Sequence, residues 1–115
     1  MSLPIRLMPE PVRTLAFGSI NPAYMGIGTS FDHRARMVYI ANLTNAKLMF
    51  SFDGVDDHFP LPIYSFIMLD CCYNKSDSEL FDMTVGSRIY VKELSATGSP
   101  SVGAVYVTVF YGKDN

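Results

Sequence analysis

Hydrophobic and polar residues alternate along several short stretches of this chain, with the period of two that is typical of a half-buried β-strand. The alternation is clearest in residues 47–53, 88–94 and 104–111. Gly, Pro, Asn and Asp separate such stretches, as expected of turns between strands. No stretch of ten or more residues shows a helical period. The pattern predicts an all-β domain of about seven or eight strands.

Strands of this number and spacing favour an antiparallel β-sandwich of jelly-roll or Greek-key type, with a closed barrel as the alternative. Residues 36–42 and 47–53 are expected to form an antiparallel hairpin around a turn at residues 44–46. The strongly apolar run 65–72 is predicted to be a central core strand. A short strand at 57–61 contains a proline, which suits the edge of a sheet.

The N-terminal stretch, residues 1–11, differs from the rest of the chain. It holds three of the seven prolines and has no regular hydrophobic period. We therefore predict an extended arm at 1–11, which either floats or docks, followed by a single domain at 12–115.

The composition points to a protein that needs a partner. Hydrophobic residues make up 49% of the chain and charged residues only 17%, against an average of about 25%, so much of the surface must be uncharged. The net charge is -2 and the basic residues are scattered, which argues against binding nucleic acid or a membrane surface. Because we find no apolar membrane-spanning run and no signal peptide, we expect synthesis in the cytoplasm, with the adjacent Cys71 and Cys72 reduced.

Two polar clusters are candidates for chemical sites, and neither predicts catalysis. Residues 53–58 bring three aspartates next to His58, but their spacing fits no known cation loop. An acidic turn, initiated by Asp53 with Gly54 at positive φ, is the better interpretation. His33 beside Asp32 lacks a nucleophile to activate, and is interpreted as a solvated loop histidine. We predict no catalytic residue, no metal site and no cofactor.

Aromatic residues occupy strand positions where a soluble monomer would prefer Thr, Lys or Glu. These residues are Tyr39, Tyr90, Tyr106 and Phe110. Two explanations remain open: loops or the arm cover these strands, or the aromatic side chains form an interface, where Tyr and Phe are enriched. In either case something must cover them.

The segment 51–58 reads Ser-Phe-Asp-Gly-Val-Asp-Asp-His, with residues 39–44 before it and the strands 89–92 and 105–109 after it. This layout resembles small virion proteins of tailed bacteriophages, in particular capsid decoration or cement proteins, which are small jelly-roll domains that staple neighbouring capsomers. The resemblance covers most of the chain. It implies no catalytic residues, and contact through an extended terminus and exposed strands.

From this resemblance and the aromatic positions we expect a virion protein that oligomerises and binds the major capsid protein or another virion protein. The expected interface residues are Pro4, Ile5, Leu7, Met8, Tyr39, Tyr90, Tyr106 and Phe110. A tail or neck accessory protein is the alternative within the virion. A carbohydrate-binding β-sandwich, with Tyr24, Tyr64 or Tyr73 as stacking platforms, is the alternative from another class. A flat aromatic strand face would favour protein, and a concave cluster of loop aromatics would favour sugar.

Overall fold

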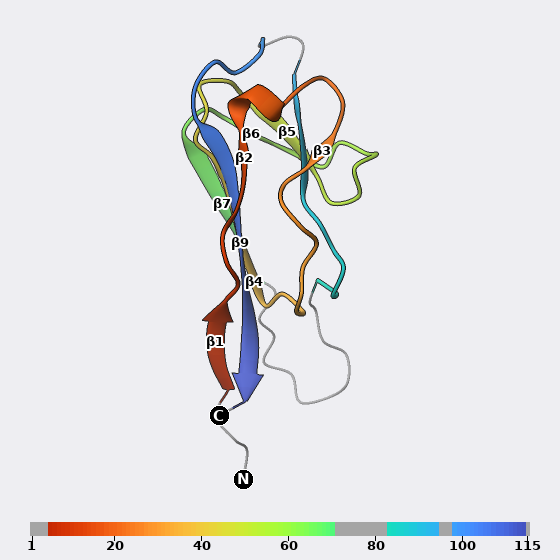
Figure 1. The fold of residues 1–115 in the computed structure, drawn as a ribbon, viewed down its shortest axis with the longest axis vertical. Helices are drawn as coiled ribbons and strands as arrows, with labels where there is room; N and C mark the ends of the chain where they lie inside the picture. The colour runs from red at the N-terminus through yellow and green to blue at the C-terminus, as the bar shows by residue number, and fades with distance from the viewer. Residues whose placement is uncertain (1–4, 71–82, 95–97, 115) are drawn as a thin grey trace.

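The computed structural model describes residues 5–70, 83–94 and 98–114. Within these residues the protein is all-β, with nine strands in two antiparallel sheets and a 3-10 helix at Phe17–Ser19. The molecule is elongated, measuring 54 × 23 × 21 Å (Figure 1). None of the described residues belongs to a helix with the length and hydrophobicity required to span a membrane.

The first sheet, called sheet A, has its long C-terminal strand near the centre. Its strands are β1 (Ile5–Pro9), β2 (Arg13–Ala16), β4 (Met37–Asn42), β7 (Ser65–Asp70) and β9 (Ala104–Asp114). On one side β9 pairs with β4, and β4 in turn pairs with β7, which lies at the edge. On its other side β9 pairs with β2 near its beginning and with β1 near its end.

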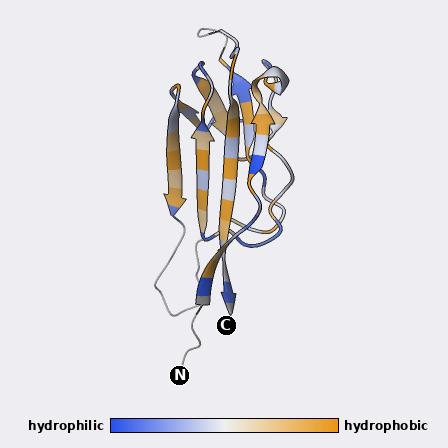
Figure 2. Cartoon of the chain, turned by 60° about the vertical axis from the view of Figure 1, so that its left-hand side comes forward, coloured by the Kyte–Doolittle hydropathy of each residue, from blue (hydrophilic) through white to orange (hydrophobic). Residues whose placement is uncertain are grey.

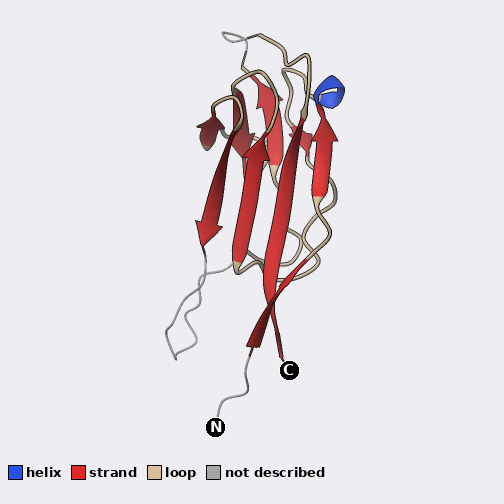
Figure 3. Ribbon diagram, turned by 90° about the vertical axis from the view of Figure 1, so that its left-hand side faces the viewer, coloured by secondary structure: helices blue, strands red, loops and turns tan. Residues whose placement is uncertain are grey.

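The second sheet, called sheet B, is shorter. Its strands, in spatial order, are β3 (Met25–Gly26), β8 (Tyr90–Glu93), β5 (Leu48–Ser51) and β6 (Phe59–Leu61). Figure 3 shows the strands of both sheets running along the length of the molecule.

The hydrophobic core draws on both sheets. Sheet A contributes Val105, Val107 and Val109, and sheet B contributes Phe50 and Val91, all of them fully buried. Apolar and more polar residues alternate along the strands in Figure 2. The predicted alternation in 88–94 and 104–111 is therefore confirmed, because Ile89 and Val91 in the first stretch and the three valines in the second enter the core.

The predicted hairpin of residues 36–53 does not form, because β4 and β5 lie in different sheets. Asn42 is fully buried at the end of β4 and stabilises the connection to β5. Its Nδ2 donates hydrogen bonds to the carbonyls of Ala46 and Leu61, at 2.9 and 3.0 Å, and its Oδ1 accepts one from the backbone N–H of Thr44. Since Leu61 belongs to sheet B, these bonds stabilise a turn from one sheet to the other.

The prediction of a central strand at 65–72 is also wrong, because β7 is the edge strand of sheet A and pairs with β4 within the described residues. Its burial alternates: Ile67 and Leu69 pack against the core, whereas Phe66 and Met68 are exposed. The continuous apolar run therefore does not indicate burial on both faces. It reflects an edge strand whose outward side chains are largely apolar.

Two other expectations concern the neighbours of β7. The short strand with Pro60 does lie at an edge, as β6 of sheet B, so that prediction is confirmed. Cys71 and Cys72, predicted to be reduced, lie outside the described residues.

The N-terminal stretch forms a strand of sheet A. Ile5 lies opposite Asp114 and Pro9 opposite Phe110, so β1 pairs along the final residues of β9. β1 and the end of β9 project together beyond the other strands (Figure 1). Residues 1–4, with Pro4 of the predicted arm, lie outside the described residues.

Candidate functional site

The candidate site is the outer face of sheet A, called the apolar face. Residues directly opposite each other in an antiparallel sheet point to the same side. Tyr39 lies opposite Met68 and Thr108, and the next outward position of β4, Ala41, lies opposite Phe66 and Tyr106. The register therefore defines the apolar face as Met37, Tyr39, Ala41, Phe66, Met68, Tyr106, Thr108 and Phe110.

Large apolar side chains on this face remain open to solvent in the part of the chain that is described. Phe66 is 63% exposed and Met68 is 41% exposed. The rings of Tyr39 and Phe66 pack against each other, with centroids 5.5 Å apart. Tyr106 and Phe110 are partly buried. Apolar side chains exposed together on one face make this face a candidate interaction surface.

The N-terminal strand continues the apolar face. Pro9 lies opposite Phe110, and Leu7, two positions along β1, falls on the same side and is 48% exposed. Met8 lies opposite Tyr111 and so points to the other side. The predicted arm and part of the predicted aromatic face thus belong to one sheet, which the sequence alone did not indicate.

Tyr90 does not belong to the apolar face, and the prediction of one shared aromatic face is wrong in this respect. Tyr90 lies in β8, on the outside of sheet B. There Gly54 sits so close that a Cβ atom at that position would lie 3.1 Å from the Tyr90 ring. The Arg88 guanidinium also lies over the ring, 5.8 Å from its centroid. The chain itself covers this aromatic side chain.

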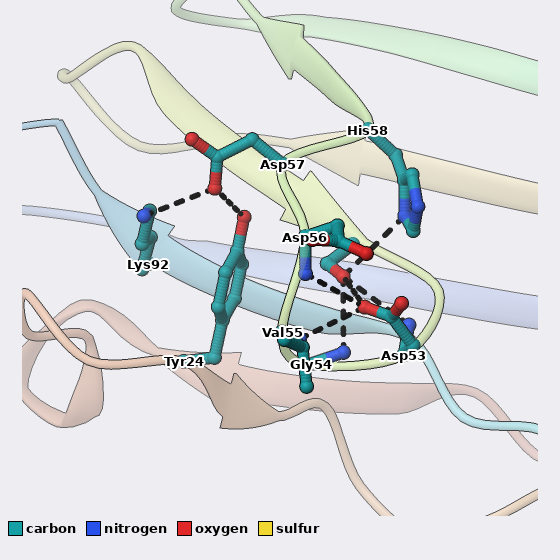
Figure 4. A network of polar contacts seen from close by, with 9 residues as sticks. Tyr24, Asp53, Gly54, Val55, Asp56, Asp57, His58 and Lys92 are labelled. Atoms are coloured by element: carbon teal, nitrogen blue, oxygen red, sulfur yellow. Dashed lines mark hydrogen bonds and ion pairs between the residues drawn. The ribbon is translucent and has the colours of Figure 1, made fainter.

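The loop that covers sheet B is built around Asp53. Asp53 Oδ1 accepts hydrogen bonds from the backbone N–H groups of Val55 and Asp56, at 2.8 and 2.9 Å (Figure 4). These bonds, with one from Ser51 Oγ, lower the pKa of Asp53 to about 2. Gly54 has a φ of 76°, as a turn of this kind requires. The prediction of an acidic turn initiated by Asp53 is confirmed.

Asp57 fastens the same loop to sheet B. Its Oδ1 accepts a 2.6 Å hydrogen bond from the hydroxyl of Tyr24 and lies 3.0 Å from Lys92 Nζ (Figure 4). The Tyr24 and Lys92 contacts lower the pKa of Asp57, whereas burial and the Asp57 carboxylate raise the pKa of Tyr24. Lys92 Nζ also lies 4.8 Å from the centroid of the Tyr24 ring. These contacts occupy both the hydroxyl and part of the ring of a tyrosine considered above as a sugar platform.

Asp53, Asp56 and His58 bring one potential metal-ligating atom each to within 4.8 Å of one another. All three residues are exposed. His58 Nδ1 already accepts a 3.0 Å hydrogen bond from the backbone N–H of Phe52, and Asp53 Oδ1 holds the turn. His58 Nδ1 and Asp53 Oδ1 therefore stabilise the loop that covers sheet B.

A buried ionic cluster at the start of β2 escaped sequence reasoning. Glu10, with a side chain only 2% exposed, contacts Arg13 Nη2 at 2.7 Å and His33 Nδ1 at 2.6 Å. Burial acts to raise the pKa of Glu10, but the hydrogen bonds with His33 and Arg13 outweigh it and lower the pKa below 4.5. The His33 ring stacks on Tyr111, with centroids 3.6 Å apart. His33 is an exposed loop residue, as interpreted above, with a side chain that is 46% exposed, but it also contacts a buried carboxylate, which the sequence did not predict.

This ionic cluster borders an open pocket of about 410 Å³. The pocket is lined by Asp32, His33, Arg34, Arg36, Val85, Tyr111 and Gly112. Arg13 donates to the carbonyls of Thr29 and Ser30, which fixes the loop that carries His33. We assign the cluster a structural role, because its buried members bond to one another and to the backbone.

Comparison of the chain with protein-family models, with curated proteins and with solved structures gives no significant match. The geometry of the two outer faces is therefore the basis for proposing a function.

Proposed function

We propose that the protein is a non-enzymatic structural protein of a phage virion, of the capsid decoration type, which binds a capsid subunit through the apolar face of sheet A. The observation that carries the proposal is the contrast between the outer faces of the two sheets. The loop at residues 53–58 covers the outside of sheet B, whereas Phe66 and Met68 leave sheet A apolar and open in the described chain.

The shape of the apolar face favours a protein partner over a sugar. Its aromatic side chains stand on neighbouring strands of one sheet, and Phe66 and Tyr39 are in contact. Sugar sites place a few polar groups in a concave pocket, whereas protein interfaces bury aromatic residues in a broad, dry core. Tyr24, one of the loop tyrosines considered as a sugar platform, is already engaged by Asp57 and Lys92.

The strand order supports the jelly-roll assignment that belongs to this proposal. Without β1, sheet A runs β2-β9-β4-β7 and sheet B runs β3-β8-β5-β6, and most connections pass from one sheet to the other. Two sheets joined in this way are characteristic of jelly rolls, which include viral capsid and lectin domains. Because one fold serves many functions, the apolar face and not the fold carries the argument.

Binding through the apolar face would stabilise a capsid by linkage. A protein that binds only the assembled shell lowers the free energy of the assembled state relative to the dissociated subunits. The docked strand β1, with Leu7 on the same side, would extend the contact beyond the body of the sheet. The protein would act in the virion after synthesis in the host cytoplasm.

The proposal is tested by co-sedimentation with empty shells assembled from the major capsid protein of the genome that carries this gene. We expect the wild-type protein to sediment with the shells. Tyr106→Lys places a charge in the apolar face, where desolvation is costly, and should weaken binding at least tenfold. Val55→Lys is the matched control, because Val55 is an exposed apolar residue in the loop over sheet B. Wild-type protein that stays in the supernatant, or equal binding by Tyr106→Lys, would reject the proposal.

A further inference from the structure

The edge strands of the two sheets differ in how they are protected. In sheet B, β3 has only two residues and β6 carries Pro60. On one side of sheet A, β1 carries Arg6 and Pro9. Short length, proline and basic side chains are the usual means by which proteins keep an edge strand from pairing with another chain.

The opposite edge of sheet A, β7, has none of these features. Its six residues are Ser-Phe-Ile-Met-Leu-Asp, without proline, glycine, lysine or arginine, and its one charge is at the end. Among the described residues it pairs with β4 alone, so the backbone N–H and C=O groups of residues 65–69 that point away from β4 face no other described strand. A long apolar edge of this kind favours pairing with a further strand.

We propose that β7 pairs with β7 of a second copy of this chain, antiparallel, across a two-fold axis normal to sheet A. Two-fold symmetry is the commonest symmetry of homo-oligomers, and it lets one strand serve as both partners. The pairing would join the two A sheets into one continuous sheet. This inference goes beyond the proposed function and does not depend on it.

The side chains of β7 suit this pairing. A two-fold axis normal to the sheet keeps the outer faces on one side, so an axis through Ile67 sets Phe66 opposite Met68 of the second copy. Both are exposed in the single chain. The same axis sets Asp70 opposite Tyr64 and keeps the two Asp70 carboxylates at opposite ends of the paired strands. A two-fold axis parallel to the strands would instead pair the two β7 strands in parallel. It would invert one sheet, so that the apolar face of one copy and the core side of the other would lie on the same side of the joined sheet.

The second copy is favoured over a different protein because the edge is self-complementary. Its outward side chains are Phe66, Met68 and, at the end of the strand, Asp70, and the self-paired register brings no like charges directly opposite each other. Phe66 and Met68 also continue into Tyr39 on the neighbouring strand, so a dimer would double the apolar face without a break.

Sedimentation equilibrium of the purified full chain tests the dimer. We expect wild-type protein to form dimers at micromolar concentration. Met68→Lys keeps the pairing with β4 but sets lysines close together across the axis, and should raise the dimer dissociation constant at least tenfold. Val55→Lys should dimerise as wild type, and so should Tyr106→Lys, because Tyr106 lies two strands away from the edge. Circular dichroism checks that each variant is folded.

Hydrogen–deuterium exchange of the wild-type chain provides a readout that needs no variant. Pairing at the edge should protect amides of residues 65–70 increasingly as the protein concentration rises. A protein that stays monomeric at high concentration would overturn the proposal. A dimer that is lost in Tyr106→Lys but kept in Met68→Lys would also overturn the proposal, because it would indicate that the two copies pack through the apolar face and not through the edge strand. Protection that does not change with concentration would show that another part of the same chain occupies the edge. Loss of shell binding with the dimer intact would contradict the proposed function alone.

Discussion

Glu10 shows how a single buried charge positions the start of sheet A. The residue lies between β1 and β2, and its carboxylate contacts Arg13 and His33, while its backbone N–H donates to the carbonyl of Val109 in β9. Arg13 is itself buried, and its Nη1 has no hydrogen-bond partner among the described residues. Removing the negative charge would leave a buried guanidinium without its counterion, which is strongly unfavourable.

We predict that Glu10→Gln lowers the free energy of unfolding by about 3 kcal/mol, because Arg13 then remains buried and unpaired. Urea denaturation measures the change. Asp56→Asn, which neutralises an exposed carboxylate, should cost less than about 0.5 kcal/mol.

The dependence on pH has a defined direction. The pKa of Glu10 is lower in the folded protein than in the unfolded chain, so its contribution to stability is present above the ordinary pKa of a glutamate and is lost as the pH falls through the folded-state pKa. The Glu10→Gln variant should therefore lose less stability than wild type on acidification. Equal stabilities of wild type and variant at neutral pH would contradict the account of this cluster.

The sequence could not predict this cluster. Glu10 and Arg13 are three positions apart, but no local pattern indicates that both are buried or that His33 joins them. His33 lies 23 positions after Glu10. The Asp53 turn, in contrast, was predicted correctly, since its hydrogen bonds connect residues two or three positions apart. Contacts between residues close in the chain can be predicted from a sequence, whereas contacts that depend on sheet pairing cannot.

At the level of the elements, the alternation of side chains predicted which residues of a strand are buried but not which strand is its neighbour. The valines of β9 enter the core as expected. The hairpin prediction for residues 36–53 was wrong because the alternation of β4 and β5 is compatible both with pairing to each other and with pairing in separate sheets. The buried hydrogen bonds of Asn42 favour the separate sheets. The prediction that Tyr90 shares a face with Tyr39 was wrong for the same reason. The alternation indicates that Tyr90 points outward, but it does not indicate from which sheet.

The turn held by Asn42 offers a test of this explanation. We predict that Asn42→Ala lowers the free energy of unfolding by roughly 2–4 kcal/mol, because buried backbone groups of Thr44 and Leu61 lose their hydrogen-bond partner. Asn45→Ala is the control. Asn45 bonds to Ser101 at the exposed surface of the same turn, and its loss should cost less than about 1 kcal/mol. Thermal or urea unfolding of both variants measures the difference, and similar losses would argue against a special role for Asn42.

The whole molecule has one outer face covered by its own chain and one that is not covered by the described residues. On sheet B, Gly54 and Asp57 bring the loop down onto Tyr90, Tyr24 and Lys92. On sheet A, no described loop covers the outward aromatic side chains. Exposed residues of β1 and of the edge strand β7 extend this apolar face. The composition anticipated an apolar surface that needs a partner, but only the sheet pairing indicates where that surface lies.

Two methionines with similar exposure provide the most direct test that the apolar face is the binding surface. Met68 lies on that face, whereas Met25, in the edge strand β3, lies opposite Val91 and so on the core side of sheet B. Met68 on sheet A is 41% exposed and Met25 on sheet B is 38% exposed, so hydrogen peroxide should oxidise both at comparable rates in dilute, monomeric protein. Peptide mass spectrometry then measures both rates in the complex with empty capsid shells. We predict that oxidation of Met68 slows at least fivefold on binding while oxidation of Met25 does not change. Protection of Met25 with Met68 still fully reactive would contradict the assignment of the apolar face of sheet A as the binding surface.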